Sequence, residues 1–143
     1  MAFVALFPGQ GSQTIGMLAD FEMEFPDIKE TFNEASDALD YDLWVVAQEG
    51  SAQQLALTEI TQPLMLTAGV ALYRAWSQAN GKGASYMAGH SLGEYTALTA
   101  AGSLRLADAV QLVRARGQFM QEAVPKGTGA MAAVIGLDDD KIE

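Results

Sequence analysis

The sequence predicts an α/β domain with a mainly parallel sheet and flanking helices. Short apolar segments alternate with longer amphipathic segments along the 143 residues, which is the pattern of strands joined by crossover helices. Half of the residues are hydrophobic, so a chain of this length can bury a substantial core. In a parallel sheet the ligand crevice lies beyond the carboxyl ends of the strands. The segments that follow the strands are therefore the first candidates for a functional site.

The N-terminal third begins with a strand and continues as a helix. The apolar segment 2–7 (AFVALF) precedes a proline and a glycine, which predicts a short strand buried on both faces. A turn at 8–13 (PGQGSQ) follows it. From 14 to 39 the spacing of apolar residues predicts a helix that is interrupted near Pro26 and exposes its acidic residues to solvent.

The rest of the chain continues the alternation of helices and strands. The segment 61–81 predicts a helix with Pro63 in its first turn and Gly81 at its end. Four further elements are expected: a strand at 86–88, helices at 92–101 and 106–124, and a strand from Met131 (MAAVIGL).

Composition excludes several classes of function. A formal charge of −10 argues against nucleic-acid binding, which needs clustered lysines and arginines. The absence of cysteine and the single histidine argue against disulfide frameworks, thiolate metal sites and histidine-rich metal sites. No apolar run is long enough to cross a bilayer, and the first residues lack the features of a signal peptide. We therefore expect a soluble, cytoplasmic protein.

The charge is unevenly distributed along the chain. The segment 20–49 holds ten acidic residues and one lysine, whereas the segment 74–126 holds six basic and three acidic residues. The second segment is thus net positive by three charges. It is the part of the chain that favours an anionic small ligand.

The segment 89–93 (GHSLG) matches the pattern G-x-S-x-G between an expected strand and an expected helix. In that pattern a serine occupies a strained turn from which its hydroxyl projects at the edge of the sheet. The glycines are needed where backbones approach too closely for a Cβ atom. The amides at the start of the following helix can stabilise an oxyanion. The pattern favours Ser91 as a nucleophile over the alternative role of a helix N-cap.

His90 and the turn at 8–13 lie beside this predicted elbow. His90 directly precedes Ser91, so its side chain should point away from the attacking oxygen, and we expect it to pack or orient rather than to act as general base. The turn lacks the third glycine of a dinucleotide-binding motif and the lysine of a P-loop. It is either a plain tight connection or a source of backbone amides for the neighbouring strand end.

Arg116 lies within the apolar face of the helix expected at 106–124. An advance of about 100° per residue puts the following residues on that face: Leu106, Ala109, Val110, Leu112, Val113, Gly117, Phe119 and Met120. Burial of an unpaired guanidinium is costly, so Arg116 should pair with a structural acid or with a bound carboxylate or phosphate. The alternative is an arginine that reaches solvent from the edge of the face.

Four motifs together resemble the family of malonyl-CoA:acyl-carrier-protein transacylases, the acyltransferases of bacterial fatty-acid synthesis. In order they are PGQGSQ at 8–13, TQP at 61–63, GHSLGEYTAL at 89–98 and RARGQFMQ at 114–121. The resemblance runs over essentially the whole chain. It implies the α/β-hydrolase-like core of the acyltransferase fold.

The same resemblance implies roles for five residues. Ser91 is the nucleophile that carries the malonyl ester, and the backbone amides of Gln10 and Leu92 form the oxyanion hole. Arg116 binds the free malonyl carboxylate, and Gln10 and Gln62 lie near the substrate. The implied substrates are malonyl-CoA and phosphopantetheinylated acyl carrier protein. No metal or redox cofactor, nucleic acid or membrane partner is implied.

The sequence departs from this family in its C-terminal part. Family members carry a second, catalytic histidine, a further glutamine and most of a ferredoxin-like subdomain downstream, and none of these is present here. We expect residues 1–126 to form the N-terminal part of the hydrolase-like domain, and residues 127–143 to begin the small subdomain. The missing C-terminal portion is then an expected partner. Because a general base contributes about 10²- to 10⁴-fold, the chain should be inactive or nearly so by itself.

Two other functions stay open at this stage. A serine esterase or thioesterase of the α/β-hydrolase type shares G-x-S-x-G, but it gives no reason for Arg116 within an apolar face. A non-catalytic fragment would only bind coenzyme A, the carrier protein or a complementary chain.

Overall fold

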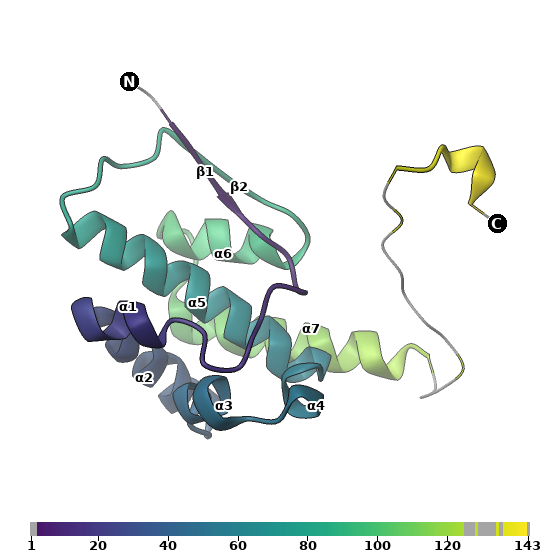
Figure 1. Ribbon diagram of the computed structural model, residues 1–143, viewed down its shortest axis with the longest axis horizontal. Coiled ribbons are helices and arrows are strands. Elements are labelled where there is room, and N and C mark those ends of the chain that lie inside the picture. Colours follow the sequence, from purple (N-terminus) through teal and green to yellow (C-terminus); the bar gives the residue numbers. More distant parts are fainter. Residues whose placement is uncertain (1–2, 125–127, 129–133, 135, 143) are drawn as a thin grey trace.

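A two-stranded parallel sheet and a set of helices form the part of the chain that the computed structural model describes, residues 3–124, 128, 134 and 136–142 (Figure 1). The elements are β1 (Val4–Phe7), α1 (Ala19–Glu24), α2 (Asp27–Leu39), α3 (Leu43–Glu49), α4 (Ala52–Leu55), α5 (Thr58–Gln78), β2 (Tyr86–Gly89), α6 (Leu92–Ala100), α7 (Leu106–Glu122) and a 3₁₀ turn, η1 (Asp139–Lys141). The predicted α/β class with a parallel sheet is confirmed.

The register of the sheet brings two loops together. Val4 lies opposite Tyr86 and Phe7 lies opposite Gly89, in parallel orientation. Both strands therefore end at the same edge of the sheet, where β1 continues into the turn at 8–13 and β2 continues into Ser91. Helix α6 packs against both strands, as Figure 1 shows.

Helix α5 is the centre of the helical core. It packs against α2, α6 and α7, and Figure 1 shows it running through the middle of the helices. Phe32 of α2, Leu64 of α5 and Val110 of α7 are fully buried in this core. Because α5 is surrounded on most sides, its N-terminal half buries polar side chains as well, and Gln62 is among them.

The first strand differs from the sequence-based prediction. It begins at Val4, and it is not buried on both faces, because Val4 is 52% and Leu6 76% exposed while Phe7 is buried. Within the described residues no element covers the outer face of β1. Strand β2 also leaves an apolar residue open to solvent, since Tyr86 is 74% exposed.

The helix expected at 14–39 is shorter and later than predicted. Gly16 and Leu18 both adopt a left-handed backbone, with φ of 78° and 67°, and the first helical residue is Ala19. The interruption predicted at Pro26 is confirmed, because it separates α1 from α2.

Helices α3 and α4 were absent from the sequence-based prediction. Each begins behind a capping side chain: Asp42 Oδ1 accepts from the Val45 amide, and Ser51 Oγ accepts from the Gln54 amide. Such caps are the usual start signal of a helix. They are the features of the sequence from which these two helices were predictable.

Helix α5 begins earlier than predicted. Its first residue is Thr58, so Pro63 lies beyond the first turn rather than within it. Its end is close to the prediction: Asn80 takes a left-handed φ of 59° and the Gly81 amide donates to the Trp76 carbonyl at 2.9 Å. This is the hydrogen bond of a Schellman motif.

The later elements agree with the prediction within about two residues, a common uncertainty at helix ends. Strand β2 extends to Gly89, α6 ends at Ala100 and α7 ends at Glu122. The strand expected from Met131 falls mostly outside the described residues.

Ser91 joins β2 to α6 in a strained backbone conformation. Its φ of 54° and ψ of −108° lie in a region that residues with a Cβ atom seldom adopt. The Gly93 amide donates to the His90 carbonyl at 2.9 Å and closes the turn. The Ser91 side chain accepts no hydrogen bond from the helix amides, so the alternative of an ordinary N-cap is wrong.

Two glycines allow this elbow to fit between the strands and α6. A Cβ atom at Gly89 would overlap the backbone of Gly93, and one at Gly93 would overlap the carbonyl of Phe7 at the end of β1. The predicted close approach of backbones is confirmed. It fixes Ser91 at the carboxyl edge of the sheet.

Replacement of Gly93 by alanine should lower the free energy of unfolding by at least about 2 kcal/mol, because the methyl group meets rigid backbone rather than a movable side chain. Urea denaturation of the purified chain measures the change. Gly83→Ala is the matched control, since no atom lies within 4 Å of a Cβ at that position. Equal losses in the two variants would contradict the close approach at the elbow.

The strain at Ser91 predicts an inverted order of stability for two substitutions. Ser91→Gly and Ser91→Ala both remove the hydroxyl, but only glycine relieves the positive φ. We expect Ser91→Gly to be more stable than Ser91→Ala by about 1 kcal/mol. Thermal and urea unfolding measure the two stabilities. At an unstrained position glycine is the less stable residue, so a Ser91→Gly variant that is less stable than Ser91→Ala would show that the backbone at residue 91 is relaxed.

Candidate active site

The turn at 8–13 lies against the Ser91 loop. A Cβ atom at Gly9 would sit 3.2 Å from the His90 carbonyl oxygen and 3.3 Å from its Nδ1 atom. Gln10 is exposed in this turn. The backbone amides of Gln10 and Leu92 donate no hydrogen bond to another described residue, while the Leu92 side chain is buried in the core. Both amides lie at the edge of the sheet where Ser91 lies, and neither has a partner within the described residues.

The His90 side chain is exposed beside the Gly9 turn. Among the described residues it forms no hydrogen bond with Ser91. Its predicted role in packing or orienting this loop stays a prediction.

A chain of hydrogen bonds connects Ser91 to the helical core. Arg116 Nη2 donates to Ser91 Oγ at 2.9 Å, and Arg116 Nη1 donates to Gln62 Oε1 at 2.7 Å. Gln62 Nε2 in turn lies 3.4 Å from the Met120 sulfur. Gln62 is fully buried and Ser91 is exposed. The half-buried guanidinium of Arg116 therefore connects the buried Gln62 to the exposed Ser91.

The positive charge of Arg116 has no carboxylate partner among the described residues. The ion pairs among the described residues are Arg74–Glu34, Arg105–Asp108 and Lys141–Asp138. Arg116 instead contacts an amide oxygen and a hydroxyl, and its Cζ atom lies 5.7 Å from the centroid of the Tyr95 ring. A structural acid, the first alternative for this arginine, is therefore not found in the described structure. A guanidinium so arranged is suited to an anionic ligand beside Ser91.

The apolar face predicted for α7 is only partly correct. Leu106, Ala109, Val110, Val113 and Gly117 are buried. Leu112, Phe119 and Met120 are exposed by 48%, 68% and 38%. The reason is that α7 packs against α2 and α5 along a narrower stripe than the sequence suggests. Arg116 lies beside this stripe and points toward Ser91.

Tyr95 is the site residue that sequence reasoning missed. It lies in the first turn of α6, four residues after Ser91, and residues at that spacing are close in a regular helix. That spacing was a usable signal, but nothing in the sequence shows that the side chain of a different helix lies over the ring.

Perturbed pKa values occur outside this site. Burial raises the pKa of Tyr41. A hydrogen bond from Arg105 lowers the pKa of Asp108 at the exposed start of α7. Among the described residues no three histidine, aspartate or glutamate side chains gather as metal ligands. None of the described helices combines the length and apolar character needed to cross a bilayer.

Comparison with known proteins shows close relatives. The sequence model of the family described as "Acyl transferase domain" matches residues 3–142. The malonyl CoA-acyl carrier protein transacylase of Escherichia coli (strain K12) is 63% identical over 140 residues, which cover 98% of this chain and 45% of that protein. The protein of the same name from Bacillus subtilis (strain 168) is 47% identical over 138 residues, which cover 96% of this chain and 43% of that protein.

Solved structures agree with these relatives. The malonyl CoA-acyl carrier protein transacylase of Coxiella burnetii has a TM-score of 0.95 at 53% identity, over 100% of this chain and 45% of that one. A malonyl-transacylase in complex with its type II PKS acyl-carrier protein has a TM-score of 0.93 at 54% identity, over 98% and 45%. The chain spans less than half the length of these relatives. Because the family match extends over nearly all of its residues, the chain belongs to the acyl transferase domain family.

Proposed function

We propose that this chain supplies the serine nucleophile and the carboxylate-binding arginine of a malonyl-CoA:acyl-carrier-protein transacylase. The observation that carries the proposal is the 2.9 Å hydrogen bond from Arg116, a cation without a carboxylate partner in the described residues, to Ser91 Oγ. The names of the relatives support malonyl-CoA and acyl carrier protein as the substrates.

In the first half-reaction Ser91 Oγ attacks the thioester carbonyl of malonyl-CoA. A general base takes the hydroxyl proton, and the carbonyl oxygen becomes an oxyanion that the amides of Gln10 and Leu92 stabilise. These two amides have no other partner in the described residues. Collapse of the tetrahedral intermediate breaks the carbon–sulfur bond, and coenzyme A leaves as its thiol while Ser91 carries a malonyl ester.

Arg116 selects the acyl group by its free carboxylate. A carboxylate and a guanidinium form paired, charge-assisted hydrogen bonds that fix both distance and direction. Gln62 holds the guanidinium from the buried side. An acyl group without a carboxylate leaves Arg116 unpaired, so malonyl is favoured over neutral acyl groups of similar size.

In the second half-reaction the phosphopantetheine thiol of acyl carrier protein attacks the malonyl ester. The carbon–oxygen bond to Ser91 breaks, the hydroxyl recovers its proton and the carrier protein leaves as a malonyl thioester. The solved complex of a relative with its acyl-carrier protein supports this partner. Neither step uses a metal or redox cofactor, and we place the reaction in the cytoplasm.

We propose that the general base comes from the part of the relatives' length that this chain does not span. His90 is the only histidine of the sequence, and it lies against the Gly9 turn without a hydrogen bond to Ser91. We infer that residues 1–126 are the N-terminal part of the hydrolase-like domain, that residues 127–143 begin a ferredoxin-like subdomain, and that the remaining portion of the enzyme supplies the base.

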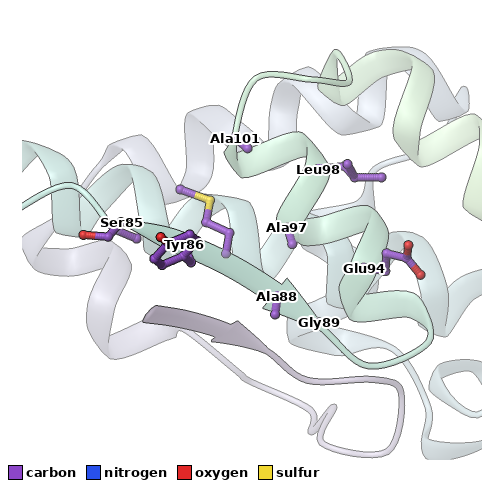
Figure 2. A pocket seen from close by; sticks show the side chains of 10 residues that line it. Ser85, Tyr86, Ala88, Gly89, Glu94, Ala97, Leu98 and Ala101 are labelled. Carbon is purple, nitrogen blue, oxygen red and sulfur yellow. The ribbon is translucent and has the colours of Figure 1, made fainter. Parts of the chain in front are cut away.

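Within the described residues no strand pairs with the second edge of β2, and this supports the division of the fold. A hollow of about 780 Å³ lies between β2 and α6. Figure 2 shows Tyr86 and Ala88 lining it from the strand, and Ala97 and Leu98 lining it from the helix. Parallel sheets are normally covered on both faces and continued beyond two strands. We expect the remaining portion of the enzyme to lie here.

The direct test compares the chain alone with a hybrid enzyme, in which residues 1–143 replace the corresponding segment of the Escherichia coli relative. After incubation with malonyl-CoA, intact mass should show one malonyl group on the hybrid and none on the chain alone, because only the hybrid contains the base. Ser91→Ala should abolish the adduct in the hybrid. An adduct at another residue, or stoichiometric acylation of the chain alone, would contradict the mechanism.

Arg116→Ala tests the selection of malonyl and separates the proposal from a simple esterase. Loss of a charge-assisted pair should lower kcat/KM of the hybrid for malonyl-CoA by about 10- to 100-fold and leave kcat/KM for acetyl-CoA unchanged or higher. Arg114→Ala is the matched control, because Arg114 lies on the same helix and contacts the Leu39 carbonyl instead. A serine hydrolase without carboxylate recognition would lose both activities equally or neither.

A further inference from the structure

The guanidinium of Arg116 is held from three directions. Gln62 Oε1 accepts from Nη1 at 2.7 Å, Ser91 Oγ accepts from Nη2 at 2.9 Å, and the Tyr95 ring lies beneath Cζ at 5.7 Å. The three supports come from α5, from the β2–α6 elbow and from α6. Together they determine where a carboxylate bound by Arg116 would lie.

One of these supports changes when the site is loaded. In a malonyl ester the Ser91 oxygen is bonded to an acyl carbon, and an ester oxygen accepts hydrogen bonds more weakly than a hydroxyl oxygen does. The incoming carboxylate is a charged acceptor and competes for the same N–H groups. The Ser91 contact is therefore weakened at the stage when the guanidinium must hold the acyl group in place. Gln62 and Tyr95 are then the remaining supports of the guanidinium.

The Tyr95 ring is built to give lasting support. It is half-buried and packs against the helical core on one side, so its position does not depend on Arg116. The face of an aromatic ring carries partial negative charge and attracts a cation above it. Unlike a carboxylate, the ring does not neutralise the guanidinium, and the N–H donors stay free for the ligand.

We propose that Tyr95 is a positioning residue for malonyl selection: its ring holds the Arg116 guanidinium in register with Ser91 while the acyl carboxylate is bound. Tyr95 does not touch the reacting atoms and acts through Arg116. This inference rests on the proposed function, because it assigns Tyr95 to the same carboxylate site.

The selectivity of the hybrid enzyme, kcat/KM for malonyl-CoA divided by kcat/KM for acetyl-CoA, is the quantity that tests it. Tyr95→Leu should lower this ratio by about 3- to 30-fold, mainly by raising KM for malonyl-CoA. Tyr95→Phe should keep the ratio of the unsubstituted hybrid because the ring is retained. A purely structural role would lower both activities and leave the ratio unchanged.

Fluorinated phenylalanines test the charge of the ring face without changing the shape that the fold requires. Phenylalanine with one, two or three fluorine atoms at position 95 keeps the shape of the ring and progressively weakens its negative face. We expect the selectivity ratio to fall stepwise along the series. A ratio that stays flat would overturn the proposal, even if Tyr95→Leu fails to fold.

Tyr41→Leu is the matched control. Arg114 lies in α7 like Arg116, and its Cζ atom is 5.6 Å from the centroid of the Tyr41 ring. Loss of the Tyr41 ring therefore removes an equivalent contact at a different arginine and should leave the selectivity ratio unchanged. The outcome also separates the two proposals. If Arg116→Ala leaves the ratio unchanged, the proposed function is wrong; if Arg116→Ala lowers it and the Tyr95 variants do not, only the role of Tyr95 is wrong.

Discussion

The hydrogen bonds of the Arg116 guanidinium join three helices at the edge of the sheet. They connect α7 to Gln62 in α5 and to Ser91 at the start of α6. Gln62 is fully buried, and an unpaired amide in the core would be costly, so the amide and the guanidinium satisfy each other. The charge is left without a carboxylate within the described residues, and this leaves capacity for an anionic ligand. The core and the site therefore depend on the same side chain.

The backbone makes the other half of the site. Ser91 has a positive φ of 54° next to the close approach of Gly93 to the end of β1, and such strain persists where helix and strand both pack around it. The hydroxyl projects toward solvent as a result.

The sequence predicted the elbow well because its geometry depends on residue types at neighbouring positions. Gly89, Ser91 and Gly93 lie where β2 ends and α6 begins, and the turn there requires glycines at fixed positions around the serine. Arg116 was recognisable because helical periodicity placed it within a predicted apolar face, although the buried stripe of α7 is narrower and Arg116 lies beside it. The Tyr95 contact and the exposed Val4 and Leu6 were not predictable, since each depends on which distant segment lies over the residue. The short helices α3 and α4 were missed because an apolar pattern over so few turns does not identify a helix.

The central claim is that the acyl carboxylate on Ser91 is bound by Arg116. A crystal structure of the hybrid enzyme with the malonyl ester trapped on Ser91 tests it most directly. We expect the free carboxylate to accept hydrogen bonds from the Arg116 guanidinium, with the Gln62 contact retained. A malonyl ester whose carboxylate points into solvent, while Arg116 still contacts the Ser91 oxygen, would contradict the claim.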